Sequence, residues 1–150
     1  MSADRTFIDR NNAERTRLRA LVARLTDAEL ARPMPAGWTV AAVLGHLAFW
    51  DERILVLLER WEQSPSAVPH AINEADVDWV NDATKALLLA MPPRRVAELA
   101  VAIAETVDAK VAALPDDVLS RNEAAGSPLL MTRATHRREH LTEIEHVLGA

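Results

Sequence analysis

The chain has 150 residues, of which 49% are hydrophobic and 26% charged, and its formal net charge is −5. This length predicts a single domain, residues 1–150, and the composition is typical of a globular protein. The acidic balance and the scattered basic residues argue against a nucleic-acid partner. The sequence has no cysteine, no apolar run long enough to span a membrane and no export signal, so we expect a cytoplasmic protein.

The first half of the chain has the pattern of two long helices. Apolar residues at intervals of three and four predict the first over residues 6–25. Thr26 and Glu29 then have the spacing of a capping box, which predicts a short helical turn before a proline-rich break. Thr39 is the predicted N-cap of the second long helix, residues 40–63, whose apolar positions form one stripe.

The second half begins with a linker rich in proline and serine, residues 64–69, and a shorter predicted helix over residues 75–90. Two prolines suit the first turn of a third long helix, residues 92–114. A serine followed by a proline gives a similar start signal for a fourth, residues 127–149. No segment has the pattern of a strand. We therefore expect an all-α protein, a four-helix bundle with a long crossover between the second and third long helices.

Three histidines on two of these predicted helices, His46, His136 and His140, are candidate site residues. His136 and His140 are four residues apart, so on a helix both side chains can reach one metal ion. His46 lies close to the apolar stripe of the second long helix, and we expect it to face the interior. The spacing alone leaves two interpretations open, because hydrogen-bonded core histidines also have this pattern. His70 and His146 are expected to face solvent.

Motifs on these helices resemble the signatures of the DinB/YfiT-like superfamily of metalloproteins. They are GWTV, LGHLA and WDE within residues 37–52, and HxxxH on the last helix. The resemblance covers most of the chain and implies a DinB-like four-helix bundle with a divalent ion, usually zinc or nickel. By position, the ligands would be His46, His136 and His140. Characterised relatives include S-transferases and an isomerase that use thiols such as mycothiol, bacillithiol or glutathione, and many of these bundles form homodimers.

Three imidazole ligands would leave a coordination position open, where a metal-bound thiolate or water would be the nucleophile. Trp50, Arg53, Arg133 and Arg137 are predicted to line the mouth of this site, because guanidinium groups suit carboxylates on a thiol or an electrophile. Alternatively, the arginines extend into solvent and Trp50 belongs to the core.

The resemblance therefore implies a metal-dependent thiol S-transferase or isomerase, with a small-molecule thiol and an electrophile as its partners. Two alternatives remain open from the sequence. One is a metal-activated hydrolase that acts through water. The other is a non-catalytic bundle that binds a small molecule or a partner without turnover.

Overall fold

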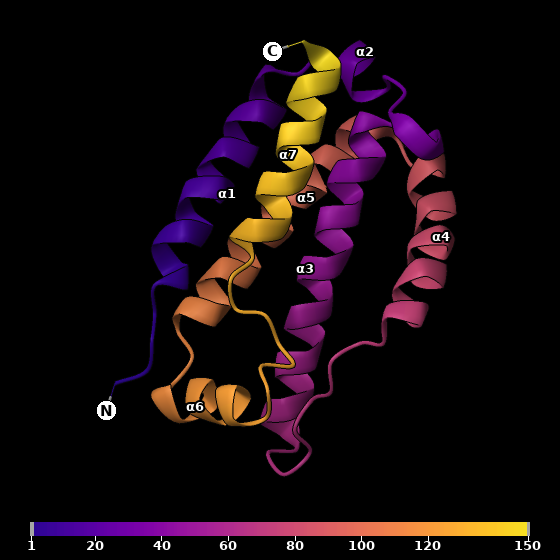
Figure 1. Ribbon diagram of the computed structural model, residues 1–150. Helices are drawn as coiled ribbons and strands as arrows, with labels where there is room; N and C mark the ends of the chain where they lie inside the picture. The colour runs from indigo at the N-terminus through magenta and orange to yellow at the C-terminus, as the bar shows by residue number, and fades with distance from the viewer. Residues whose placement is uncertain (1, 150) are drawn as a thin grey trace.

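A computed structural model describes residues 2–149, which form seven α-helices and one short 3-10 turn (Figure 1). In chain order these are α1 (Phe7–Arg24), α2 (Asp27–Leu30), η1 (Pro35–Gly37), α3 (Val40–Gln63), α4 (Glu74–Ala90), α5 (Pro93–Ala112), α6 (Asp116–Ala124) and α7 (Ala134–Leu148). Within the described residues the only extended pairing is an isolated bridge between Pro33 and Thr39, so the all-α prediction is confirmed. None of these helices is both long and apolar enough to cross a membrane.

Four helices that contribute buried residues to the core, α1, α3, α5 and α7, lie side by side (Figure 1). Helix α1 contacts α5 and α7, and α3 contacts the same two helices from the other side. Helix α4 lies against the outside of α3 and has no fully buried residue. The apolar faces meet in a core that includes Leu18, Leu44, Leu47, Ala97, Leu141 and Ile144.

Local sequence signals place the starts of two helices correctly. The Thr39 hydroxyl accepts a hydrogen bond from the backbone N–H of Ala42 at 3.1 Å, which caps α3. Thr26 and Glu29 form the reciprocal capping box at α2. The prediction of a long helix over residues 40–63 is confirmed without change.

The N-terminal half of α3 is enclosed by its neighbours, since every residue from 40 to 48 is buried. Gly45 lies in the middle of this run. A Cβ atom there would lie 2.5 Å from a side-chain carbon of Leu88 in α4 and 2.6 Å from one of Val96 in α5. Glycine therefore lets α4 and α5 approach α3 closely, one residue before His46.

The fourth long helix begins later than the sequence predicts. The predicted start at Ser127 is wrong, because Ser127 has a left-handed backbone (φ 55°) and α7 begins at Ala134. Asn11 of α1 determines this start, since its side-chain oxygen accepts hydrogen bonds from the backbone N–H groups of Arg133 at 2.7 Å and Ala134 at 2.9 Å. A cap from a distant helix leaves no signal beside the helix that it caps.

A short helix, α6, lies between α5 and α7, at the end of the molecule away from the C-terminus (Figure 1). It begins directly after Pro115. The buried amide of Asn122 donates a hydrogen bond to the carbonyl of Leu129 at 2.8 Å and accepts one from its N–H at 3.1 Å. These bonds hold the segment after α6 as a loop, where the sequence predicts the first turns of the fourth long helix.

Candidate metal centre

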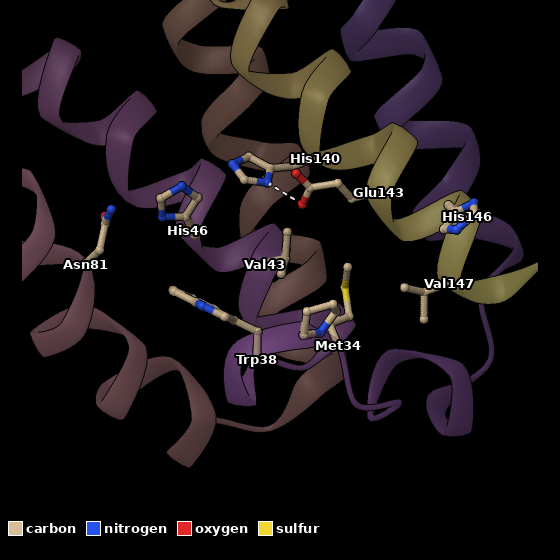
Figure 2. A pocket seen from close by; sticks show the side chains of 10 residues that line it. Met34, Trp38, Val43, His46, Asn81, His140, Glu143, His146 and Val147 are labelled. Carbon is tan, nitrogen blue, oxygen red and sulfur yellow. Dashed lines mark hydrogen bonds and ion pairs between the residues drawn. The ribbon is translucent and has the colours of Figure 1, made fainter.

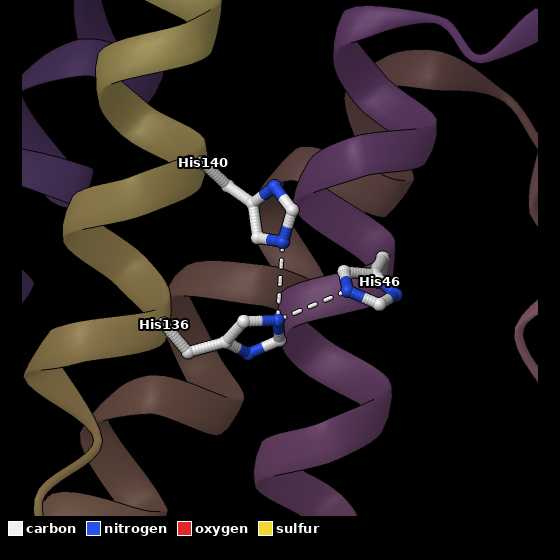
Figure 3. A group of neighbouring side chains, drawn as sticks. All are labelled: His46, His136 and His140. Atoms are coloured by element: carbon white, nitrogen blue, oxygen red, sulfur yellow. Dashed lines mark hydrogen bonds between the residues drawn. The ribbon is translucent and has the colours of Figure 1, made fainter. Parts of the chain in front are cut away.

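Three histidines from two helices meet between α3 and α7 (Figure 3). His46 Nε2 lies 3.0 Å from His136 Nε2, which in turn lies 3.1 Å from His140 Nε2. One ligand atom from each side chain lies within 4.8 Å of the others, so the group could hold a metal ion. The nitrogen of His46 on α3 points toward those of His136 and His140 on α7, as the sequence predicts for these residues (Figure 3).

The spacing of these nitrogens fits a metal site. Zinc binds imidazole nitrogen at about 2.0–2.1 Å, which in a tetrahedral site separates two ligand nitrogens by about 3.3 Å. The two nearest separations here, 3.0 and 3.1 Å, are only slightly shorter. The rings meet edge to face, with angles of 73° to 86° between their planes, so that each can aim one nitrogen at a common point.

Burial keeps two of these imidazoles neutral. It lowers the pKa of His46 to about 4, with a smaller contribution from His140. Burial also lowers the pKa of His136 to about 3, and the neighbouring histidines and arginines lower it further. At neutral pH these rings therefore have a lone pair that is free for a metal rather than occupied by a proton.

Hydrogen bonding distinguishes the two interpretations of His46. Its Nδ1 atom is buried and has no hydrogen-bond partner among the described residues. Its Nε2 atom contacts only another histidine nitrogen, that of His136. The Nδ1 atom is unpaired whether or not Nε2 binds a metal, so it does not distinguish the two interpretations. A second histidine nitrogen beside Nε2, in place of a carbonyl or carboxylate oxygen, is the contact that favours a ligand.

The third histidine has a carboxylate partner on its own helix. His140 Nδ1 lies 3.2 Å from a carboxylate oxygen of Glu143 (Figure 2). A proton on Nδ1 that is donated to this carboxylate leaves the lone pair of Nε2 directed at the other two histidines. Glu143 was not among the predicted site residues, although its position three residues after His140 is the spacing that allows this contact.

Two cavities, each of about 490 Å³, lie on either side of the three histidines. His46 and Asn81 line both. The first, shown in Figure 2, has apolar walls from Met34, Trp38, Val43 and Val147, and is also lined by His140, Glu143 and His146. The second is also lined by His136, Trp50, Arg53, Arg133 and Glu139. Two small molecules could therefore reach the histidines from different directions.

Three of the four predicted substrate contacts line this second cavity. The Trp50 ring is half-buried, and its N–H donates a hydrogen bond to the Asn81 side-chain oxygen at 2.9 Å. The Arg53 guanidinium lies 5.7 Å from the centre of that ring and forms no ion pair with the described residues. Burial lowers the pKa of Arg53, and the neighbouring charge of Arg133 lowers it further. The cavity therefore offers a guanidinium that has no carboxylate of its own.

The fourth predicted contact, Arg137, lies elsewhere. Its side chain is only 1% exposed and lines neither cavity. It forms two hydrogen bonds of 2.8 Å with Asp108 of α5 and one of 3.1 Å with Asp51 of α3. Arg133 also bonds to Asp51, at 2.8 Å. The alternative that the arginines extend into solvent is wrong for these two residues.

The remaining two histidines are exposed, as the sequence predicts. His70 lies in the linker between α3 and α4 and lines neither cavity beside the three histidines. His146 lies at the edge of the first cavity, which the sequence did not predict (Figure 2).

Fold and site together define a helical protein with a cluster of three histidines that could hold a metal ion. A family model, the mycothiol maleylpyruvate isomerase N-terminal domain, matches residues 12–138. The chain belongs to this family, which is part of the DinB-like superfamily. The matched region includes His46 and His136 and ends two residues before His140. No match was found among curated proteins or solved structures.

Proposed function

We propose that this protein is a metal-dependent enzyme that transfers or isomerises a substrate with the help of a low-molecular-weight thiol of the mycothiol, bacillithiol or glutathione type. His46, His136 and His140 would hold a zinc or nickel ion. The observation that carries the proposal is the convergence of their Nε2 atoms between two cavities. Membership of a family described by a mycothiol-dependent isomerase supports the thiol.

The bundle architecture belongs to the same proposal. The long helices α1, α3, α5 and α7 form a closed set of contacts, and α4 lies in the connection between α3 and α5. This arrangement supports a four-helix bundle with a long crossover, in which the ligands project inward from two facing helices.

The residues around the site prepare it for a metal and for an anionic ligand. Burial keeps the His46 and His136 rings neutral. The Glu143 carboxylate would hold the proton of His140 on Nδ1, so that Nε2 is free for the metal. A divalent ion, when bound, lowers the pKa of a coordinated thiol or water and so supplies a nucleophile near neutral pH.

The two cavities support a reaction of two molecules. Both cavities have mostly apolar walls, and the second also contains the Arg53 guanidinium, which lies beside the Trp50 ring and forms no ion pair with the described residues. We assign the second cavity to a substrate with a carboxylate, which Arg53 would bind and Trp50 would support by stacking. Arg133 also lines this cavity, but its guanidinium is paired with Asp51.

A thiol-consumption assay tests the function. The metal-loaded protein is supplied with each thiol class and an electrophilic acceptor, and loss of free thiol is followed over time. We expect turnover that requires metal, is abolished in His140→Ala and is retained in His70→Ala. Ester hydrolysis without a thiol would instead support a metal-activated hydrolase. Metal binding without any turnover would contradict an enzyme and favour a ligand-binding bundle.

A second assay tests the assignment of Arg53. Two acceptors that differ only in a carboxylate and its neutral amide are compared with the unsubstituted protein and Arg53→Gln. The variant should raise KM for the acid by about tenfold and leave KM for the amide unchanged, since a hydrogen bond to a charged group contributes roughly 1.5–3 kcal/mol. Equal effects on the two acceptors would contradict the assignment.

A further inference from the structure

The metal site that we propose is assembled from two helices, and its geometry depends on how they are placed relative to each other. His136 and His140 lie one turn apart on α7, so that helix alone determines their separation. His46 comes from α3. A shift of α7 along α3 by one residue moves His136 and His140 by about 1.5 Å relative to His46. This displacement is a substantial part of the length of a metal–nitrogen bond.

We infer that Asp51 is a positioning residue that holds α3 and α7 in the register the metal site requires. This inference rests on the metal site proposed above. Asp51 lies five residues after His46 on α3, about 7.5 Å further along the helix axis. It belongs to the WDE motif, and it lines neither cavity beside the histidines.

The ion pairs of Asp51 connect the two helices directly. One carboxylate oxygen accepts a hydrogen bond of 2.8 Å from Arg133 Nε, and the other accepts one of 3.1 Å from Arg137 Nη2. Arg133 is the N-cap residue of α7, and Arg137 directly follows His136. Among the described residues, Asp51 is the only residue of α3 that forms an ion pair with α7 or with Arg133, the N-cap residue of α7.

Burial makes this connection rigid. The side chains of Asp51, Arg133 and Arg137 are 4%, 7% and 1% exposed. A charge that loses its partner in such a place is not rescued by water, and breaking a buried ion pair is therefore costly. A change of register between α3 and α7 would break both pairs at once. The pairs thus oppose the same displacement that would separate His46 from the other two ligands.

Asp108 provides a matched control for this role. Its carboxylate also binds Arg137, through two hydrogen bonds of 2.8 Å, and its side chain is 2% exposed. It lies on α5 and also pairs with Arg15 of α1. Asp108→Asn therefore removes one negative charge from the same guanidinium as Asp51→Asn does, but leaves the connection between α3 and α7 in place.

The first experiment compares metal affinity and stability in these two variants. Dissociation constants for Cu²⁺, the divalent ion that nitrogen ligands bind most tightly, are measured by competition with a chromophoric chelator. Both variants should unfold at a lower denaturant concentration than the unsubstituted protein. Only Asp51→Asn should weaken Cu²⁺ binding, by about tenfold or more. Equal weakening in both variants would overturn the role of Asp51.

A double-mutant cycle separates positioning from a simple charge effect. If Asp51 acts by placing α3 relative to α7, Asp51→Asn should have no further effect on Cu²⁺ affinity in a His46→Ala background, where both remaining ligands lie on α7. A direct electrostatic effect on the ion would persist in that background. Persistence of the tenfold loss would therefore contradict the inference.

Two further outcomes are informative. If Asp51→Asn does not fold, Arg133→Gln replaces it in both measurements. This change removes the ion pair between Arg133 and Asp51 and leaves Asp51 paired with Arg137. Unchanged Cu²⁺ affinity in Arg133→Gln would then overturn the inference. If the unsubstituted protein binds no Cu²⁺, the metal site itself is contradicted, and with it the proposed function. Tight binding that is insensitive to Asp51 contradicts only the positioning role.

Discussion

His46 Nε2 and His136 Nε2 lie 3.0 Å apart, although the two residues belong to different helices. Burial lowers the pKa of both rings, so that neither is protonated at neutral pH. Two neutral nitrogens at this distance, with a third at 3.1 Å from His136, form a donor set for a metal ion. Metal binding should therefore depend on this donor set and on the packing that supports it.

The carboxylate behind His140 should tune metal affinity without being a ligand. Glu143→Gln removes the charge that holds the outer proton of His140, and such partners typically contribute 10- to 100-fold to metal affinity. We expect affinity to fall by about tenfold, with little change in the unfolding midpoint, because the Glu143 side chain is half exposed. Isothermal titration with Zn²⁺ measures this. Glu139→Gln is the control, and an equal loss there would contradict the role of Glu143.

Removal of the cap that α1 supplies to α7 should destabilise the fold. Asn11 accepts hydrogen bonds from the N–H groups of Arg133 and Ala134 and donates one to the carbonyl of Met131. Asn11→Ala leaves these buried groups without partners, at a cost of about 2 kcal/mol or more in the free energy of unfolding. Urea denaturation measures it. The exposed neighbour Asn12 is the control, and similar midpoints for the two alanine variants would refute the prediction.

Close packing at Gly45 should not tolerate a methyl group. Gly45→Ala places a Cβ within 2.6 Å of both Leu88 and Val96, and overpacking of this kind costs about 1–3 kcal/mol. We expect a lower unfolding midpoint and, because Gly45 precedes His46, weaker metal binding. Gly45→Ala combined with Leu88→Ala should recover part of both losses, since it removes one of the clashing side chains. Unchanged stability of the Gly45→Ala variant would show that α4 and α5 do not pack against α3 as described.

The metal-free protein should lose stability in mildly acidic solution. In the unfolded chain both histidines titrate near pH 6.5, whereas in the folded protein the pKa of His46 is about 4 and that of His136 about 3. Between these values the unfolded state binds more protons, so the free energy of unfolding falls as the pH falls. Above pH 6.5 this contribution is fully retained.

Urea midpoints measured between pH 7.5 and pH 5 test this dependence before most carboxylates titrate. His136→Ala should reduce the slope, and His70→Ala, which changes an exposed residue, should leave it as it is. A midpoint that stays constant between pH 7 and pH 5 in the metal-free protein would contradict the burial of the two rings.

The sequence predicts elements whose signals are local. The stripe of apolar residues and the Thr39 cap predict α3 to the residue, and the i,i+4 spacing places His136 and His140 on one face of α7. The start of α7 could not be predicted, because its cap is Asn11 of a distant helix.

The same reason explains the error at Arg137. Its position on α7 beside the histidines suggested a contact with substrate, but the two carboxylates that surround it belong to α3 and α5. The sequence does not predict Asn81 as a site residue either, because only the packing of α4 against α3 brings it to the two cavities. Interactions that depend on which helices are neighbours need the fold.

The metal content of the purified and reconstituted protein tests the central claim most directly. Elemental analysis should find about one equivalent of zinc or nickel per chain. His46→Ala, His136→Ala and His140→Ala should each lose most of it, whereas His70→Ala and His146→Ala should retain it. No metal in the unsubstituted protein after reconstitution, or unchanged metal content in all three ligand variants, would contradict the site.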